Sequence, residues 1–307
     1  MIHFYKKRYI YFAISLTIFL VGFIAILVNG IHLDIGFKGG CILKYEFTGE
    51  INTEKVDDVV NKAMNRDATS QITTDIATNT KKLSISLAGK KGLSAEDQDK
   101  LDAALKTEFK DSNLKLSESN VVEPFIGKHY FKNGMIAIAL SFFLIAIYVW
   151  IRFRRIGGLS AGVMAIIALI HDVLVAFTIF VIFKMPINDN FIAVALTIIG
   201  FSVNDTIVIY DRIRENARTM RAGYPIEDLV DTSITQSMTR SINTALATFF
   251  SIVIVYLFAH FYGISSIEGF ALPMMFGIIS GSYSTICIAG PLWVMWKKHK
   301  AKVEAKA

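Results

Sequence analysis

Cysteines and charged residues are both scarce in this chain of 307 residues. Only 19% of the residues are charged, 53% are hydrophobic, and the net charge is +6. This balance is typical of an integral membrane protein with one soluble portion. The two cysteines, Cys41 and Cys287, are too few for a disulfide framework, and a bond between them is not expected because they lie in a polar region and an apolar run. We interpret both as small apolar side chains.

Six apolar stretches are each long enough to cross a bilayer, which requires about 20 residues. They are Tyr9–Val28, Gly134–Ile151, Leu159–Phe183, Phe191–Tyr210, Ile242–Phe261 and Phe270–Trp296. The first stretch is too long for the core of a signal peptide, and no cleavage signature follows it. We therefore interpret it as a retained span.

Basic residues mark one side of the membrane. They precede the first span and follow the second, fourth and sixth, as at Arg154, Arg212 and Lys298, whereas the short loops on the other side contain only Lys184. Because basic loops remain cytoplasmic, the sequence predicts that both termini are cytoplasmic and that residues 30–133 lie outside. The positive charge therefore reflects anchoring rather than nucleic-acid binding, since no interleaved basic and aromatic pattern is present.

Residues 30–133 carry strand and helix patterns in turn. Period-two alternation marks strands, and apolar residues three or four apart mark helices. The expected elements are a strand at Cys41–Phe47, a helix from Thr53, strands at Gln71–Thr78 and Leu83–Leu87, a helix opened by Ser94 and a strand at Leu114–Val122. This order is that of a ferredoxin-like fold. We expect a small binding or supporting domain, because no catalytic cluster is evident in it.

The sequence thus predicts an integral membrane α-helical bundle of six spans with an α+β ferredoxin-like outer domain between the first and second. The expected divisions are a cytoplasmic N-terminus with the first span (1–29), the outer domain (30–133), a five-helix membrane region (134–296) and a basic cytoplasmic tail (297–307). Residues 211–238, charged and broken at Gly223, are expected to form an amphipathic helix on the membrane surface.

Asp205 lies inside the fourth span, where a carboxylate costs about 3 kcal/mol on insertion scales. It should be neutral, paired or directed to a wet interior, although a purely structural hydrogen bond to another helix is an alternative. Asp205 is roughly 8 Å of helical rise inside Asp211. Arg240 enters the fifth span from the same side, either as a snorkelling anchor or as the partner of Asp205. Protonation of the aspartate would break such a pair and could thereby move a helix.

Further polar side chains occur at positions that we expect to face the interior of the bundle. They are His171 and Asp172 in the third span, Ser202, Asn204 and Thr206 in the fourth, and Asn243 in the fifth. A single buried histidine is usually structural. The adjoining aspartate makes a functional role more plausible, because it places two ionisable groups at the same depth.

Small residues recur one turn apart in two spans. Gly158 and Gly162 form one pair, and Gly277 and Gly281, followed by Ser284, form another. This spacing lets helix backbones approach closely and is a weak motif by itself. It predicts tight packing within the bundle.

Four motifs carry a family resemblance. The longest is GFSVNDT at Gly200–Thr206, continued by DRIREN at Asp211–Asn216, and shorter ones lie at Ile170–Val173, Met238–Thr244 and Ile267–Phe270. Together with the order of one span, one outer domain and five spans, they resemble the SecF side of the SecD/SecF protein-export family, in the resistance-nodulation-division superfamily. The resemblance covers nearly the whole chain. Two residues depart from the family pattern: Phe201 stands where Tyr is usual, and Gly36 stands where an outer motif usually has Asp.

The resemblance implies an accessory subunit that uses the proton motive force to help the Sec translocon export polypeptides across the bacterial cytoplasmic membrane. It implies that Asp205 and Arg240 serve proton passage, and it implies no cofactor. One charge that crosses 100 mV releases about 2.3 kcal/mol, enough to bias a conformational equilibrium. Because six spans are half of the superfamily's usual twelve, a SecD-like six-span partner is expected.

Three other functions are compatible with parts of the sequence. A half-transporter for small molecules or lipids would share the spans, but pumps of this superfamily have far larger outer domains. A passive scaffold would make every polar residue structural. An intramembrane enzyme is disfavoured, because we find no HExxH, no protease-type aspartate pair and no converging Ser/His arrangement in the spans.

Overall fold

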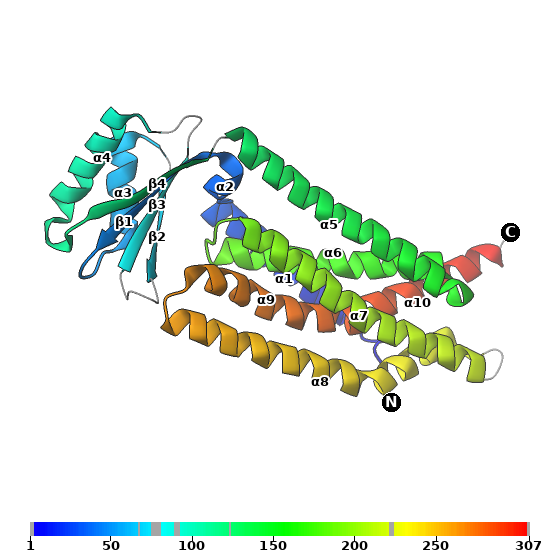
Figure 1. Ribbon diagram of the computed structural model, residues 1–307. Helices are drawn as coiled ribbons and strands as arrows, with labels where there is room; N and C mark the ends of the chain where they lie inside the picture. Colours follow the sequence, from blue (N-terminus) through cyan, green and yellow to red (C-terminus); the bar gives the residue numbers. More distant parts are fainter. Residues whose placement is uncertain are drawn as a thin grey trace.

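The computed structural model describes residues 3–66, 68–74, 81–88, 93–122, 124–220 and 224–305. An α/β domain stands at one end of a bundle of long helices, and both termini lie at the opposite end (Figure 1). Among the described residues, six helical segments are long and apolar enough to cross a membrane, which confirms the predicted number of spans. They are Arg8–Asn29, Gly127–Arg152, Gly158–Ile182, Asp189–Thr219, Ile226–Phe261 and Ser265–Glu304.

The α/β domain, called the sheet domain below, lies between the first two spans as predicted. Its elements are β1 (Gly40–Phe47), α3 (Thr53–Met64), β2 (Ala68–Thr74), β3 (Lys81–Ala88), α4 (Ala95–Glu108), η1 (Lys110–Ser112) and β4 (Lys115–Val122). The strands form one antiparallel sheet in the order β2-β3-β1-β4, and α3 and α4 lie on one face of it (Figure 1). The second half of the predicted strand Gln71–Thr78 falls outside the described residues.

Alternating side chains build the core of the sheet domain. Leu43 and Tyr45 of β1 and Ile85 of β3 are fully buried beneath Val60 of α3 and Leu105 of α4. These positions are the apolar faces that the sequence periodicity predicts, because residues two apart in a strand point to the same face. The Ser94 hydroxyl accepts a hydrogen bond from the Asp97 amide at 3.2 Å and caps α4, as expected.

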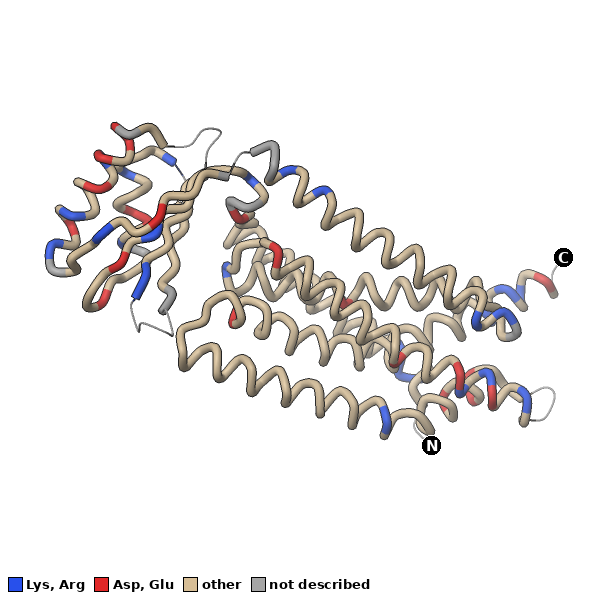
Figure 2. Tube along the Cα trace, viewed as in Figure 1, with Lys and Arg blue, Asp and Glu red and all other residues tan. Residues whose placement is uncertain are grey.

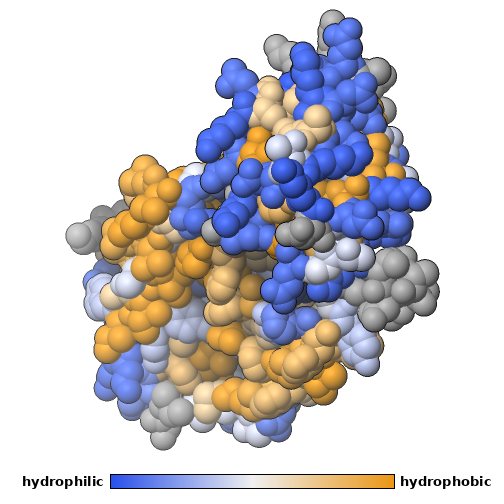
Figure 3. Space-filling model, turned by 90° about the vertical axis from the view of Figure 1, so that its left-hand side faces the viewer, coloured by the Kyte–Doolittle hydropathy of each residue, from blue (hydrophilic) through white to orange (hydrophobic). Residues whose placement is uncertain are grey.

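The bundle has a buried centre and an apolar outer ring. Its elements are α1 (Arg8–Asn29), α2 (Ile35–Lys38), α5 (Pro124–Arg152), η2 (Arg154–Ile156), α6 (Gly158–Ile182), α7 (Asp189–Thr219), α8 (Ile226–Phe261), α9 (Ser265–Ser284), η3 (Thr285–Ala289) and α10 (Gly290–Glu304). Helices α6, α7 and α9 form the centre, whereas α1, α5 and α8 expose many large apolar side chains. Viewed from the sheet-domain end, this apolar surface is separate from the hydrophilic sheet domain (Figure 3).

Residues 211–238 do not form a separate surface helix, so that prediction is wrong. Helix α7 continues to Thr219 and α8 begins at Ile226. Both helices therefore extend past their apolar stretches and remain packed against each other. Ile213 and Ile234 are buried in one cluster with Trp293 of α10. The apolar face that suggested membrane contact is therefore covered by protein. The predicted break at Gly223 lies outside the described residues.

The last span is not a single α-helix, although the sequence predicts one stretch at Phe270–Trp296. Helix α9 ends at Ser284, a π-helical turn follows at Thr285–Ala289, and α10 begins at Gly290. Such π turns are rare and frequently lie at functional sites. At the other end of the bundle, α5 already begins at Pro124, so residues 127–133, which the sequence analysis assigns to the outer domain, are helical and continuous with the second span.

Candidate functional site

Asp172 of α6 lies at the centre of a buried network of hydrogen bonds. It is fully buried and accepts hydrogen bonds from the hydroxyls of Ser202 in α7 at 2.7 Å and of Ser280 and Ser284 in α9 at 2.6 and 2.7 Å. His171 Nδ1 lies 3.2 Å from the same carboxylate. Three hydroxyl donors satisfy both carboxylate oxygens, so Asp172 ties the three central helices together.

Ser280 is the member of this network that the sequence analysis missed. Hydroxyl residues are common in membrane spans, so a serine alone gives little signal. A usable signal was its position: Ser280 lies four residues before Ser284 and therefore on the same helix face. Ser284, which the sequence assigns to helix packing, also bonds to Asp172.

His171 connects the network to α1. The ring is 5% exposed and packs against Phe19 and Tyr283, with centroid distances of 5.2 and 6.0 Å. The Tyr283 hydroxyl in turn donates to the Tyr11 carbonyl at 2.6 Å. His171 Nε2 is buried and has no hydrogen-bond partner among the described residues. The polar interior therefore includes a ring nitrogen that is free to donate or accept.

A second pair of buried hydroxyls, those of Thr206 and Thr285, lies beside this network. Thr206 lies one turn beyond Ser202 and donates to the Ser202 carbonyl at 3.1 Å. Its hydroxyl is also 3.1 Å from that of Thr285, the first residue of the π-helical turn. The hydroxyls of α7 thus extend from Asp172 to the level of Asp205.

Asp205 is 3% exposed, and its environment differs from that of Asp172. Its Oδ2 atom is buried without a hydrogen-bond partner in the described part of the chain, and so is the Ser241 hydroxyl across the interface on α8. Ser241 and Arg240 are the groups near enough to influence this carboxylate. A buried polar atom without a partner is costly and demands an explanation such as a bound proton or water.

Arg240 lies at the exposed edge of α8 and forms no ion pair with Asp205 in the described structure. Instead it lines a groove of about 870 Å³ between α7 and α8. The groove runs from Arg218 and Glu215, at the end far from the sheet domain, to Asn204, the residue before Asp205. It offers a polar route from that end of the molecule to the neighbourhood of the buried carboxylate.

The interior positions expected for Asn204 and Asn243 are corrected by the structure, because both side chains are exposed on the surface of the bundle. Arg240 is also exposed and lines the same groove as Asn204. Helical periodicity does not reveal which side of a span meets the other helices of the same chain. Polar groups on a membrane helix are nevertheless costly against lipid, so this surface is suited to a covering partner.

The small residues lie where helices approach closely. A side chain at Gly158 or Gly162 of α6 would meet the α5 backbone, and one at Gly277 of α9 would overlap α7. A Cβ atom at Gly281 would lie 3.1 Å from that of Ser202. Gly281 therefore allows α9 to bring its serines within reach of Asp172.

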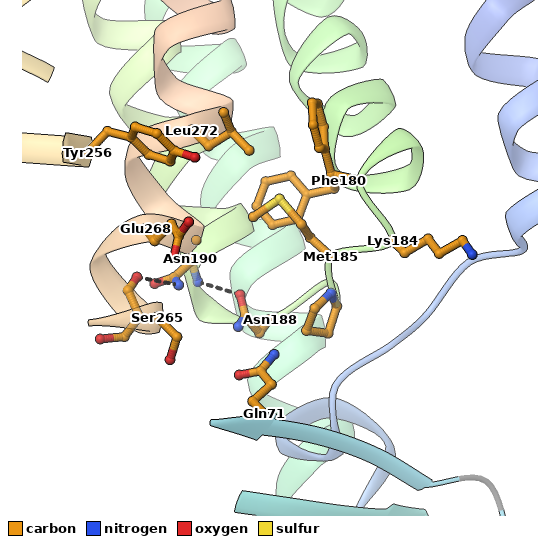
Figure 4. Close-up of a pocket in the computed structure, with 14 residues that line it drawn as sticks. Gln71, Phe180, Lys184, Met185, Asn188, Asn190, Tyr256, Ser265, Glu268 and Leu272 are labelled. Carbon is orange, nitrogen blue, oxygen red and sulfur yellow. Dashed lines mark hydrogen bonds between the residues drawn. The ribbon is translucent and has the colours of Figure 1, made fainter. Parts of the chain in front are cut away.

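A second cavity, of about 470 Å³, separates the sheet domain from the ends of the helices. Figure 4 shows Gln71 of β2 facing the loops before α7 and α9, with Lys184 pointing away. Asn190 joins the first turns of α7 and α9, because its side chain donates to the Ser266 carbonyl at 2.9 Å. Glu268 and Gly269 of the Ile267–Phe270 motif line the cavity, and Glu268 lies 3.1 Å from His260 Nδ1 of α8. We interpret this motif as a structural connection between helix ends.

Charged residues are concentrated in the sheet domain and at the far end of the bundle, with few in between (Figure 2). The fold and the buried network together define a polytopic membrane protein with a small α/β domain and ionisable groups inside its helices. Membrane proteins with such interiors commonly move ions or protons.

Comparisons with known proteins identify the family. Residues 102–299 match the family model described as protein export membrane protein SecD/SecF, C-terminal. The protein translocase subunit SecF of Thermobaculum terrenum is 35% identical over 307 residues, which cover 97% of this chain and 94% of that protein. The SecDF of Bacillus subtilis is 32% identical, and the match covers 98% of this chain but only 39% of that protein.

A solved structure supports the same conclusion. The crystal structure of SecDF from Thermus thermophilus superimposes with a TM-score of 0.78 at 27% identity, and the match covers 97% of this chain and 39% of that one. The chain belongs to the SecD/SecF family of protein-export membrane proteins, which confirms the resemblance seen in its motifs.

Proposed function

We propose that the chain is a SecF-type accessory subunit of the Sec protein translocase, in which proton movement through the membrane promotes polypeptide export. Its family membership and the names of its relatives support the export role. The observation that carries the coupling step is the Asp205 carboxylate, buried with an unpartnered oxygen next to a polar groove.

Two buried residues in the middle of α7, Ser202 and Asp205, suggest how a proton could change the structure. On one side, Ser202 is held by Asp172, so the α6–α7–α9 contact is fixed by hydrogen bonds. On the other, Asp205 faces Ser241 and Arg240 of α8, and its Oδ2 atom forms no close hydrogen bond with either of them. A charged Asp205 attracts Arg240, and protonation removes that attraction. Helix α8 is therefore the element that responds to the proton.

A membrane-embedded partner follows from the exposed polar surface. Asn204, Arg240 and Asn243 would face lipid if the chain acted alone. The relatives named SecDF are much longer than this chain, which spans 39% of the Bacillus subtilis protein. We infer that a second six-span subunit of the SecD type covers this surface and closes the groove from the side.

The basic ends of the helices support an orientation in the bacterial cytoplasmic membrane. Basic residues flank the spans at the end that carries both termini, and this end is therefore proposed to be cytoplasmic. The sheet domain then projects outside, where a preprotein emerges from the Sec translocon. Its hydrophilic surface suits contact with a translocating polypeptide.

A secretion assay tests this function. Asp205→Asn keeps the shape of the side chain but cannot ionise. The variant should therefore lose the uncoupler-sensitive fraction of polypeptide export. The matched control is Asp189→Asn, the same change at an exposed position of the same helix. Cells with each variant as their only copy are compared with and without uncoupler, and the amount of folded protein in the membrane is measured in parallel. Wild-type, uncoupler-sensitive export in Asp205→Asn would instead favour a passive scaffold.

A further inference from the structure

A pocket of about 640 Å³ lies at the end of the bundle far from the sheet domain, apart from the groove and the buried network. It is formed where α5 ends, η2 turns, α6 begins and α10 passes by. Its lining residues are Trp150, Arg154, Gly157, Gly158, Leu159, Ser160, Val163, Trp296, Lys297 and Lys300. This lining includes three cations and no carboxylate.

Two of the three cations of the pocket form no ion pair among the described residues. Arg154 and Lys297 take part in no ion pair within the described ranges, and Lys300 contacts Glu304 only at an exposed position, at 3.6 Å. Lys297 is partly buried, with its ammonium 5.5 Å from the ring centroid of Trp293. A basic group held partly out of water without an anion is electrostatically unfavourable.

The backbone adds positive potential at the same place. Gly157 precedes α6 with a φ of 96°, a conformation that favours glycine, and no side chain caps the helix. A Cβ atom there would lie 2.5 Å from the Lys297 ammonium, so this cation rests against the start of α6. Helix N-termini carry partial positive charge, which repels a cation and attracts an anion. A negative group in the pocket would therefore offset both charges.

The rim of the pocket is apolar and open to the bilayer. Trp150 and Trp296 are 48% and 51% exposed, and Leu159 and Val163 of α6 are 68% and 48% exposed. Tryptophan is enriched where membrane helices meet the headgroup layer. The occupant must therefore combine a negative group with hydrocarbon, which a free phosphate ion does not provide.

We propose that this pocket binds an anionic phospholipid. Its phosphate lies among Arg154, Lys297 and the start of α6, and its acyl chains run along Leu159 and Val163. Basic pockets between membrane helices are suited to such headgroups. The site is independent of the proton-coupling proposal, because none of its residues belongs to the groove or to the Asp172 network.

Lipid titration of the full-length protein in detergent tests the proposal. The probes are phosphatidylglycerol, phosphatidylcholine and inorganic phosphate, and the readout is the shift in melting temperature and the apparent affinity. The pocket variant is Arg154→Gln with Lys297→Gln. The matched control is Lys6→Gln with Lys7→Gln, which removes the same charge from exposed positions at the same end. Melting curves without added lipid establish that both variants are folded.

Phosphatidylglycerol should stabilise the wild type and the control, and its apparent affinity should fall at least ~10-fold in the pocket variant, given about 1 kcal/mol per basic residue. Phosphatidylcholine should have little effect on any of them. Equal weakening in the control would show general surface attraction and overturn the site. Inorganic phosphate that stabilises the wild type as strongly as the lipid would overturn the assignment to a phospholipid.

Discussion

At the scale of single residues, the two buried aspartates of the central helices have opposite environments. Asp172 accepts hydrogen bonds from three serines, whereas Asp205 keeps an oxygen without a partner. A fully satisfied carboxylate resists change because each of its bonds would have to be replaced. We therefore propose an anchoring role for Asp172 and proton exchange for Asp205.

Replacement of Asp172 by Asn should destabilise the protein. The amide has one acceptor oxygen in place of two, so at least one serine hydroxyl loses the oxygen to which it donates, and each buried group left unsatisfied costs about 1–3 kcal/mol. Thermal unfolding in detergent should show a clearly lower midpoint than the wild type. Asp189→Asn, at the exposed start of α7, should change stability by no more than about 1 kcal/mol. Equal midpoints for Asp172→Asn and wild type would refute the anchoring role.

Tyr45 gives a pH prediction for the sheet domain. Burial, with the nearby Asp102 carboxylate, raises the pKa of this tyrosine well above its ordinary value of 10.0. Because the folded state retains the proton that the unfolded state loses, the contribution to stability is complete below pH 10.0 and is lost as the pH rises further. Tyr45→Phe should therefore weaken the alkaline loss of stability, as measured by circular dichroism of sheet-domain unfolding.

Tyr130→Phe is the control for this prediction, since that tyrosine is 62% exposed. Its alkaline unfolding should match that of the wild type. The explanation would be wrong if Tyr45→Phe and the wild type lost stability at the same pH.

Individual site residues differed in how far the sequence could reveal them. Asp205 stood out because a carboxylate inside an apolar span is costly and rare. Ser280 did not, because a serine in a span costs little and acquires meaning only when a neighbouring helix brings a carboxylate to it. The exposure of Asn204 and Asn243 depends on the rotation of each helix against the others. Such packing is not encoded in the hydropathy of the span itself.

At the scale of elements, the spans and strands were predictable because their periodicities are strong. The ends of the membrane helices were not. Polar side chains such as Asn216, which donates to Ser233 at 2.9 Å, let α7 and α8 continue together beyond the apolar region. The π-helical turn at Thr285–Ala289 leaves no comparable signal, because its residues are compatible with an ordinary helix.

The contact between α7 and α9 gives a prediction about packing. Gly281→Leu would push a large side chain against Ser202 and Phe201 and separate the helices that hold Asp172. Recovery of folded protein by size-exclusion chromatography should fall strongly. Ile279→Leu serves as the control, because Ile279 is 54% exposed and a leucine fits there. Similar recovery of the two variants would argue against close α7–α9 packing.

At the scale of the whole molecule, the sheet domain and the end with both termini should lie on opposite sides of the membrane. Single cysteines at Lys100 of α4 and Ala217 of α7 occupy exposed positions at these two ends. In a background without Cys41 and Cys287, an impermeant thiol reagent added outside intact cells should label Lys100→Cys and spare Ala217→Cys. Labelling of both positions would contradict the proposed orientation.

Proton entry through the molecule is the central claim, and vesicles allow its direct measurement. The chain is reconstituted with the proposed SecD-type partner, a membrane potential is imposed, and an internal pH dye reports proton uptake. Wild type and Asp189→Asn should take up protons, whereas Asp205→Asn should fall to the rate of vesicles without protein. Proton uptake by Asp205→Asn at the wild-type rate would contradict the account.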